Sequence, residues 1–258
     1  MKIEFTKYQG TGNDFVIIDN RKGEFDKSNI ELIQHFCDRK FGIGSDGLIL
    51  IENHKVCDFN MVFYNPDGSQ SFCGNGSRCA VAFAKELGLI SDFAKFNSTD
   101  GYHEASINST GLVKLKMHNV SNIEVSESHH YMDTGSPHYN CFEKNVDAID
   151  IVAIGRKIRY NERFKEVGTN VNFIEQLSEG IKVRTYERGV ENETLSCGTG
   201  VTACALSTAL VSKAPSGEIK VSTTGGDLSV SFTQTDTGFE DVWLIGPTKF
   251  VYKGEIEV

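Results

Sequence analysis

Two short segments of the 258-residue chain share the pattern Cys-Gly-x-Gly, and they are its clearest chemical signal. One begins at Cys73 and the other at Cys197, and each leads into a helix-like run, over 77–87 and 201–213. The unpaired N–H groups and partial positive charge at a helix start can hold a carboxylate and lower the pKa of a thiol. Two such thiols could remove a proton from one face of a carbon and return one to the other.

A cysteine at a single helix start is often only a small, inert residue. Here, however, the same unit occurs twice, about half the chain length apart, with glycines that let a ligand approach the backbone. The repetition favours a paired chemical function for Cys73 and Cys197.

Other polar residues lie near the two segments in the sequence. Arg188 could clamp a carboxylate, and Glu187 could bind an ammonium group or tune a thiol. His138 could pair with a thiolate, although a lone loop histidine is usually unremarkable. Asparagine is common in turns for backbone reasons alone. Four turn-like asparagines are candidate ligands because they lie close to the motifs: Asn13, Asn65, Asn75 and Asn170.

Two glycine-rich segments match nucleotide-binding loops only in part. The segment 42–47 reads G-x-G-x-x-G but follows a helix and precedes a strand, the reverse of a dinucleotide fingerprint. The segment 198–203 reads G-x-G-x-x-A, but a polar stretch separates it from the preceding strand. Histidines and cysteines are not at zinc-ligand spacing. We therefore expect neither a metal nor a nucleotide cofactor.

Composition narrows the class of protein. Apolar residues make up 39% and charged residues 24%, as in globular proteins, and the net charge of −9 argues against nucleic-acid binding. No apolar stretch reaches the roughly 18 residues that span a bilayer, and the N-terminus does not resemble a signal peptide. Seven cysteines without a CxxC pair fit a reduced compartment. We expect a cytoplasmic protein without nucleic-acid or membrane partners.

The first half of the chain contains more strand-like than helix-like text. Ser28 and Glu31 form a possible capping box for a helix that extends to Phe41. The helix after Cys73 should stop near Gly88. Strands are expected at 3–7, 15–18, 48–52, 58–64 and 112–117.

The second half repeats this order. Asp147 is the expected cap of a helical run that includes Ile158, and Pro215 should end the helix after Cys197. Strands are expected at 171–175, 181–187, 219–222, 228–232 and 242–245.

The repeated order indicates an internal duplication, and segment 10–15 loosely resembles segment 168–173. We expect an α+β fold of two pseudo-symmetric α/β domains, each a mixed or antiparallel sheet wrapped round a central helix, with the active site in the cleft between them. The expected domains are 1–118, to which the strand 249–258 returns, and 119–248.

At these residues the chain resembles the diaminopimelate epimerase family from end to end. The segments that carry the resemblance are 10–15, 42–47, 64–69, 73–79, 169–173, 186–189, 197–200 and 246–247. The resemblance implies a cofactor-independent, PLP-independent isomerase that converts LL- to meso-2,6-diaminopimelate in lysine and peptidoglycan precursor biosynthesis. It also implies a small-molecule substrate and a homodimer.

The resemblance also implies residue roles. Cys73 and Cys197 would be the two acid/bases, and His138 and Glu187 would tune the thiol pKa values. Substrate would be held by Asn13, Asn65, Gly74, Asn75, Asn170, Glu187, Arg188, Gly198 and Thr199. Two positions depart from the family: Ser136 replaces a common asparagine, and Gly47 replaces a glutamine found in some members.

Three other functions remain open from the sequence. A proline or hydroxyproline racemase would use a similar thiol pair, but the Glu187-Arg188 segment and the asparagines favour a substrate with a second polar end. A nucleotide-binding oxidoreductase would use the glycine loop at Gly198. A non-catalytic carboxylate-binding protein would use both cysteines only as helix caps.

Overall fold

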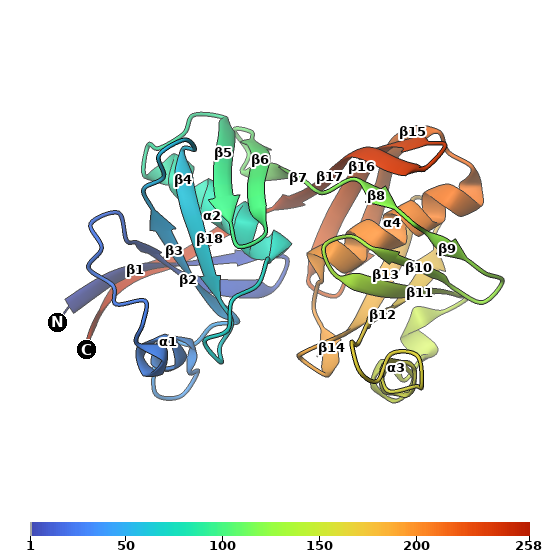
Figure 1. Cartoon of the computed structure of the whole chain (residues 1–258), viewed down its shortest axis with the longest axis horizontal. Coiled ribbons are helices and arrows are strands. Elements are labelled where there is room, and N and C mark those ends of the chain that lie inside the picture. The colour runs from blue at the N-terminus through green and yellow to red at the C-terminus, as the bar shows by residue number, and fades with distance from the viewer. Residues whose placement is uncertain (1) are drawn as a thin grey trace. The chain divides into compact units, whose positions relative to one another are not determined.

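The computed structural model describes residues 2–258, and the chain divides into two compact units. Unit 1 comprises Met1–Leu115 and Gly246–Val258, and unit 2 comprises Lys116–Ile245. In each unit strands outnumber helices (Figure 1).

Unit 1 is one mixed sheet with two helices. Its elements are β1 (Lys2–Gly10), β2 (Asn13–Asp19), α1 (Ile30–Cys37), β3 (Gly47–Glu52), β4 (Phe59–Tyr64), α2 (Gly74–Glu86), β5 (Phe93–Ser98), β6 (Gly101–Ile107), β7 (Leu112–Lys116) and β18 (Lys249–Glu257). The pairs β2–β3 and β4–β5 are parallel, and the other neighbouring strands run antiparallel. The last strand, β18, pairs with β1.

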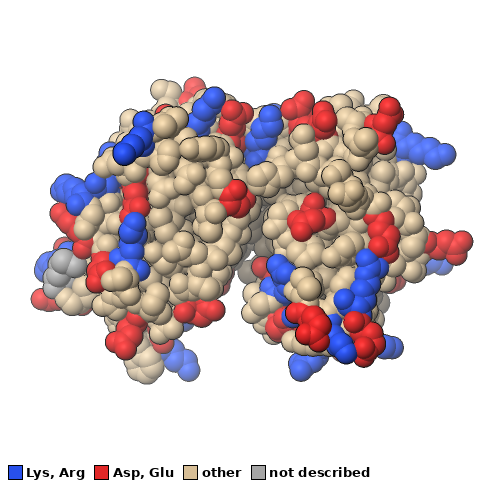
Figure 2. Space-filling view, viewed as in Figure 1, with Lys and Arg blue, Asp and Glu red and all other residues tan. Residues whose placement is uncertain are grey.

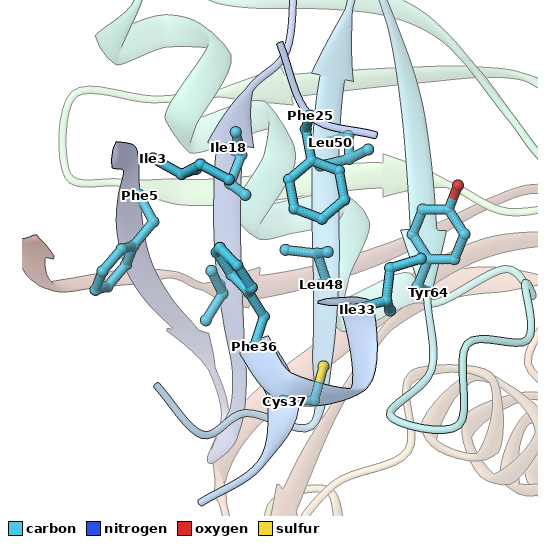
Figure 3. Packing of buried hydrophobic residues seen from close by; sticks show 11 residues of the cluster. Ile3, Phe5, Ile18, Phe25, Ile33, Phe36, Cys37, Leu48, Leu50 and Tyr64 are labelled. Carbon is cyan, nitrogen blue, oxygen red and sulfur yellow. The ribbon is translucent and has the colours of Figure 1, made fainter. Parts of the chain in front are cut away.

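Helix α2 packs against β1, β2, β3, β4 and β6, so the strands surround it, whereas α1 covers the outer face of β3. Alternate side chains of β2 and β3 therefore face different helices. Val16 and Leu48 belong to the apolar cluster beside α1 that Figure 3 shows, together with Phe36. Phe15 and Ile49 point instead toward α2. Burial of both faces explains the unbroken apolar run at 15–18.

Unit 2 has the same plan with a longer central helix. Its elements are β8 (Val120–Ser121), β9 (Glu124–Val125), β10 (His130–Asp133), β11 (Pro137–Glu143), the 3-10 helix η1 (Val146–Ala148), α3 (Ile151–Arg159), β12 (Asn170–Gln176), β13 (Ile181–Glu187), β14 (Asn192–Thr194), α4 (Gly198–Ser212), β15 (Ser216–Thr223), β16 (Gly226–Thr235) and β17 (Gly238–Pro247). Helix α4 contacts β10, β11, β12, β13, β15 and β16, and most of its residues are buried. It ends at Ser212, before Pro215.

The two units have equivalent topologies. The series β10, β11, α3, β12, β13, α4, β15, β16 in unit 2 corresponds to β1, β2, α1, β3, β4, α2, β5, β6 in unit 1, with parallel pairs at β11–β12 and β13–β15. This confirms the expected fold class of two similar α/β units with mixed sheets. The expected likeness of 10–15 to 168–173 is wrong in register: 10–15 leads into β2, whose equivalent is β11, whereas 168–173 leads into β12.

The cap predicted for α1 is wrong by one residue. Asn29 caps α1 by accepting a hydrogen bond from the N–H of Leu32 at 3.0 Å. Ser28 lies one residue earlier and is oriented toward Asp26, to which its N–H and its hydroxyl both donate. The helix stops before Phe41 because residue 38 is extended.

The cap predicted for α3 is also wrong. Asp150, rather than Asp147, accepts the hydrogen bond from the N–H of Ala153, at 3.0 Å. Asp147 instead lies in η1 and pairs with Lys182 at 2.6 Å.

The surface charges, helices and thiols can be compared with the composition. On the face drawn in Figure 2, basic and acidic side chains are interspersed, without a broad basic patch among the described residues. Within residues 2–258, no helix is both long and apolar enough to span a bilayer. Five cysteines, Cys37, Cys57, Cys79, Cys141 and Cys204, are free thiols.

Candidate active site

Cys73 occupies the N-cap of α2, at the first thiol loop (73–76). Its backbone is extended, and its sulfur accepts a hydrogen bond from the N–H of Gly76 at 3.4 Å. The thiol is half-buried, and its Sγ lies 3.8 Å from Oδ1 of Asn13. The structure therefore places a thiol where the N–H groups of a helix start point outward, as the sequence predicted.

Two of the predicted asparagines meet at this loop and one does not. Asn75 donates from Nδ2 to Oδ1 of Asn13 at 3.3 Å, and Asn13 donates in turn to Asp46 at 2.8 Å. Asn65 uses its amide nitrogen within its own turn, on Ser69 and Ser71.

Cys197 occupies the equivalent N-cap of α4, at the second thiol loop (197–200), and is buried. Its sulfur lies 3.5 Å from the hydroxyl of Thr199, and that hydroxyl lies 2.9 Å from Nε2 of His138. His138 thus reaches Cys197 through Thr199.

A directed chain of hydrogen bonds supports this histidine. Thr185 donates to Oδ1 of Asn172 at 2.8 Å, which turns the Asn172 amide nitrogen toward Nδ1 of His138, at 3.0 Å. An amide nitrogen only donates, so Nδ1 accepts and Nε2 carries the ring proton. That proton is donated to Thr199, whose own hydroxyl proton is then free to point at the sulfur of Cys197.

The equivalent positions in unit 1 are apolar. Strand register matches His138, Asn140, Asn172 and Thr185 to Phe15, Ile17, Ile49 and Phe63, respectively. The close approach to the helix start is also conserved between units. A Cβ added to Gly200 would lie 2.7 Å from Oδ1 of Asn172, and one added to Gly76 would lie 3.2 Å from Ile49. The strand side chains next to the second thiol loop therefore form a buried polar chain, and those next to the first are apolar.

The ionisation of His138 differs from the sequence expectation. Burial lowers its pKa to about 3, and the positive charge of Arg188 acts in the same direction. The ring is therefore neutral at working pH and does not act as a cationic partner of a thiolate. Instead it passes a fixed hydrogen-bond direction to Thr199.

This buried neutral histidine predicts a pH dependence of stability. A histidine in the unfolded chain has a pKa near 6.5, so unfolding takes up a proton between about pH 3 and pH 6.5. The stabilisation is complete above that range and is lost as the pH falls. We expect this group to lower the free energy of unfolding by about 2 kcal/mol between pH 7 and pH 5.

Urea unfolding of the wild type and of His138→Gln at both pH values measures this contribution. At pH 5, unfolding of the variant should take up about one proton fewer than unfolding of the wild type. Equal pH dependence of the two proteins would show that His138 is not buried in its neutral form.

A second prediction concerns Asn172, whose amide satisfies three buried partners: His138, Asn140 and Thr185. Replacement by isoleucine, the residue at the equivalent position 49, leaves Nδ1 of His138 and the Thr185 hydroxyl without this partner and leaves Oδ1 of Asn140 only the weak thiol donor of Cys204. Each such group costs about 1–3 kcal/mol, so we expect Asn172→Ile to lower the free energy of unfolding by about 3 kcal/mol or more.

Ile49→Val in unit 1 is the matched control for Asn172→Ile and should cost only about 1 kcal/mol. Both variants are measured by urea unfolding at pH 7. An unchanged midpoint for Asn172→Ile would mean that the polar chain carries no stability.

Asn170 and Arg188 come together at one edge of unit 2, close to Ser136. Oδ1 of Asn170 accepts from the backbone N–H of Arg188 at 2.9 Å, and Nδ2 donates to Ser136 at 2.9 Å. The Arg188 guanidinium donates to the same Ser136 hydroxyl at 3.2 Å and to the carbonyl of Val167 at 3.1 Å. Glu187 accepts from Thr194 at 2.8 Å, on the strand that leads to the second thiol loop.

Two residues were not predicted from the sequence. Arg78 bonds to the first thiol loop, and Asn172 bonds to the histidine that contacts the second. Arg78 is fully buried in α2 and donates to Asn75 at 2.9 Å and to Thr11 at 3.2 Å. A charged residue inside an otherwise apolar helical run was the available signal. Asn172 gave the corresponding signal as an amide within a run of strand residues.

Neither glycine-rich segment forms a dinucleotide site. The segment 42–47 runs from the end of α1 into β3, and Gly198 opens α4 behind β14, which pairs antiparallel with β13. A dinucleotide fingerprint needs a parallel strand that turns directly into its helix.

Comparison with known proteins agrees with this arrangement. The family model described as diaminopimelate epimerase matches residues 5–123 and 130–251. The chain is 48% identical over 97% of its length to a diaminopimelate epimerase of Flavobacterium psychrophilum, of which it covers 98%. It is 38% identical over 96% of its length to that of Chlorobaculum tepidum, of which it covers 98%.

Solved structures share the fold at low identity. A Bacillus anthracis phenazine biosynthesis protein of the PhzF family has a TM-score of 0.77 at 16% identity, with full coverage of both chains. A hydroxyproline epimerase of Agrobacterium vitis has a TM-score of 0.68 at 14% identity, covering 99% of this chain and 92% of that one. The fold is thus shared beyond one family, while sequence identity along nearly the whole chain is decisive: this protein belongs to the diaminopimelate epimerase family of isomerases.

Proposed function

We propose that the protein converts LL-2,6-diaminopimelate to meso-2,6-diaminopimelate without a cofactor, with Cys73 and Cys197 as the acid/base pair. One observation carries this proposal: two topologically equivalent units each have a cysteine at the N-cap of the central helix. The relatives that share the sequence along its length are named diaminopimelate epimerases.

In the proposed reaction, one cysteine acts as a thiolate and the other as a thiol. The thiolate takes the α-proton, and the electron pair of the broken C–H bond stays on the substrate. The thiol then donates its proton to the opposite face of the same carbon. At the end the two cysteines have exchanged protonation states, so the reverse reaction uses them in opposite roles and no redox partner is needed.

The helix starts supply what this reaction requires of the protein. The α-proton of an amino acid is weakly acidic, and negative charge builds up on the carboxylate as the proton leaves. N–H groups at Gly74 and Asn75, and at Gly198 and Thr199, are suited to hold that carboxylate and stabilise the charge. Fixed donors of this kind require no reorganisation during the reaction.

The remaining predicted residues are suited to bind the rest of the substrate. Arg188 and Glu187 offer opposite charges for the carboxylate and ammonium groups at the non-reacting end. Asn13, Asn65 and Asn170 offer amide donors and acceptors. We propose these roles on the basis of residue type and family resemblance.

The substrate assignment is tested by incubating the protein with LL-diaminopimelate and, separately, with trans-4-hydroxy-L-proline. Chiral chromatography should show the meso isomer in the first reaction and no epimer in the second. Failure to convert LL-diaminopimelate would overturn the proposed function, and conversion of hydroxyproline would favour the racemase alternative.

A homodimer in the cytoplasm is also proposed, because the family resemblance implies it. Light scattering during size-exclusion chromatography measures the mass of the particle. A mass equal to that of a single 28.5 kDa chain at working concentration would contradict the dimer.

A further inference from the structure

Arg78 is the most unusual buried group of unit 1. It lies in α2 close to Cys73 and has no measurable solvent exposure. Within residues 2–258, its guanidinium forms no ion pair: Nη1 donates to Oδ1 of Asn75 at 2.9 Å, Nη2 donates to Thr11 at 3.2 Å, and Nε finds no acceptor. A buried charge with only neutral partners is costly, so it calls for a functional reason.

The guanidinium remains charged at working pH. Burial lowers the pKa of Arg78 to about 10, and attraction to Cys79 and Cys73 opposes that shift. Cys79 cannot neutralise it, because burial raises the pKa of that thiol to about 12. Its two hydrogen-bond acceptors are also uncharged. The positive charge is therefore available to an anion at the first thiol loop.

We propose that Arg78 is a positioning residue of the first thiol loop, which orients the Asn75 amide and holds a positive charge beneath Cys73 so that the thiolate forms there. The inference rests on the proposed function for the role of Cys73 as an acid/base. The carboxylate of a bound substrate would be attracted by the same charge.

The orientation of Asn75 follows from the donor that reaches it. Arg78 only donates, so the amide oxygen of Asn75 must face it. The amide nitrogen then points toward Oδ1 of Asn13 at 3.3 Å, and that same oxygen lies 3.8 Å from the sulfur of Cys73. The second donor of Arg78 holds Thr11, in the turn that precedes Asn13.

Unit 2 shows that the fold itself does not require this cation. The position equivalent to Arg78 is Thr202, which is fully buried and donates to the carbonyl of Gly198 at 3.0 Å. The central helix of unit 2 therefore packs with a neutral residue there. Among the described residues, a buried guanidinium lies beside the first thiol only, while the second is supported by the neutral chain through His138.

Other charged groups near the start of β2 neutralise one another. Asp14 pairs with Lys7 at 2.6 Å and with Arg39 at 2.6 Å, and Arg39 also pairs with Asp46 at 2.7 Å. Among the described residues of unit 1, Arg78 is therefore the buried charge that no opposite charge neutralises, and its replacement removes that charge.

Alkylation of Cys73 tests the inference without substrate. The rate of its reaction with iodoacetamide at pH 7, followed by peptide mass spectrometry, reports the thiolate fraction. In Arg78→Met we expect this rate to fall at least tenfold and kcat to fall at least thirtyfold, while the melting temperature does not fall. Loss of a merely structural residue would instead lower the melting temperature. Thr202→Val, the matched control, should leave the Cys73 rate unchanged.

Arg78→Lys retains the charge without the planar fork, and it carries the test if the methionine variant does not fold. We expect Cys73 alkylation within threefold of wild type and a kcat at least tenfold lower, because Asn75 is less firmly oriented. A wild-type rate of Cys73 alkylation in Arg78→Met would overturn the inference. So would a tenfold fall in the rate of Cys73 alkylation in Arg78→Lys. Because alkylation needs no substrate, this outcome is separate from failure of the wild type to epimerise diaminopimelate.

Discussion

Replacing either Cys73 or Cys197 by alanine is expected to lower the rate of LL-to-meso conversion by about 10³-fold. General acid–base catalysis by a positioned side chain contributes typically about 10²–10⁴-fold, and each variant loses one of the two groups. Both directions of the reaction should fall together, because in the proposed mechanism each cysteine serves as the base in one direction and the acid in the other. The measurement is the initial rate of epimer formation in each direction.

Two further cysteines provide matched controls on the same helices. Cys79 in α2 and Cys204 in α4 are fully buried, and burial raises the pKa of each thiol, so neither is suited to proton transfer at neutral pH. Cys79→Ala and Cys204→Ala should keep kcat within a few-fold of wild type. Near-normal activity of Cys73→Ala or Cys197→Ala would refute the two-cysteine assignment.

The second large effect is expected at Arg188. Replacement by methionine removes a charged donor from the edge formed with Ser136 and Asn170. Hydrogen bonds to a charged group contribute about 1.5–3 kcal/mol each, so losing two to a carboxylate should raise KM by about 10²-fold. The substitution keeps the backbone N–H of residue 188, which donates to Asn170. We therefore expect kcat to change much less than KM.

Arg184→Met is the control for Arg188→Met, because Arg184 lies in β13, the strand that Arg188 directly follows, and pairs with Glu193 at 2.6 Å. It should leave KM near the wild-type value and lower only stability. If Arg188→Met leaves KM unchanged, Arg188 does not bind the substrate. A large fall in kcat with unchanged KM would place it in the chemical step instead.

The thiols of the two units lie at equivalent positions, but the buried side chains next to them differ. Beneath Cys73 lies a buried cation, Arg78, among apolar strand residues, whereas beneath Cys197 lies a neutral chain through Thr199 and His138. Each unit thus places its thiol at the start of a helix. The buried residues around the two thiols differ in charge. That difference suits the proposed reaction, in which one cysteine begins as thiolate and the other as thiol.

Local sequence patterns predicted much of this fold. The buried runs at 15–18 and 48–51 and the two Cys-Gly-x-Gly helix starts depend on neighbours in sequence, and they were placed well. The caps at Ser28 and Asp147 failed because other partners compete for those side chains: Asp26 binds the first and Lys182 the second.

The supports of the thiols were not predictable in the same way. The chain through His138 draws side chains from three strands, β11, β12 and β13, whose register is set by pairing between distant segments. A one-residue slip in any of these strands would turn the polar side chains away from the helix. Arg78 stands out in the sequence as a charged residue in an apolar helix. Its possible role became apparent only from the described structure, in which it is buried without an acidic partner.

The most direct test of the two-base mechanism follows deuterium from solvent during the first turnovers. Wild-type protein is incubated with LL-diaminopimelate in deuterated water, and product and remaining substrate are separated at low conversion. We predict one deuterium at the inverted α-carbon of the meso product and none in the recovered LL substrate, because different thiols remove and return the proton. Deuterium in recovered substrate as fast as in product would indicate a single base and contradict the mechanism.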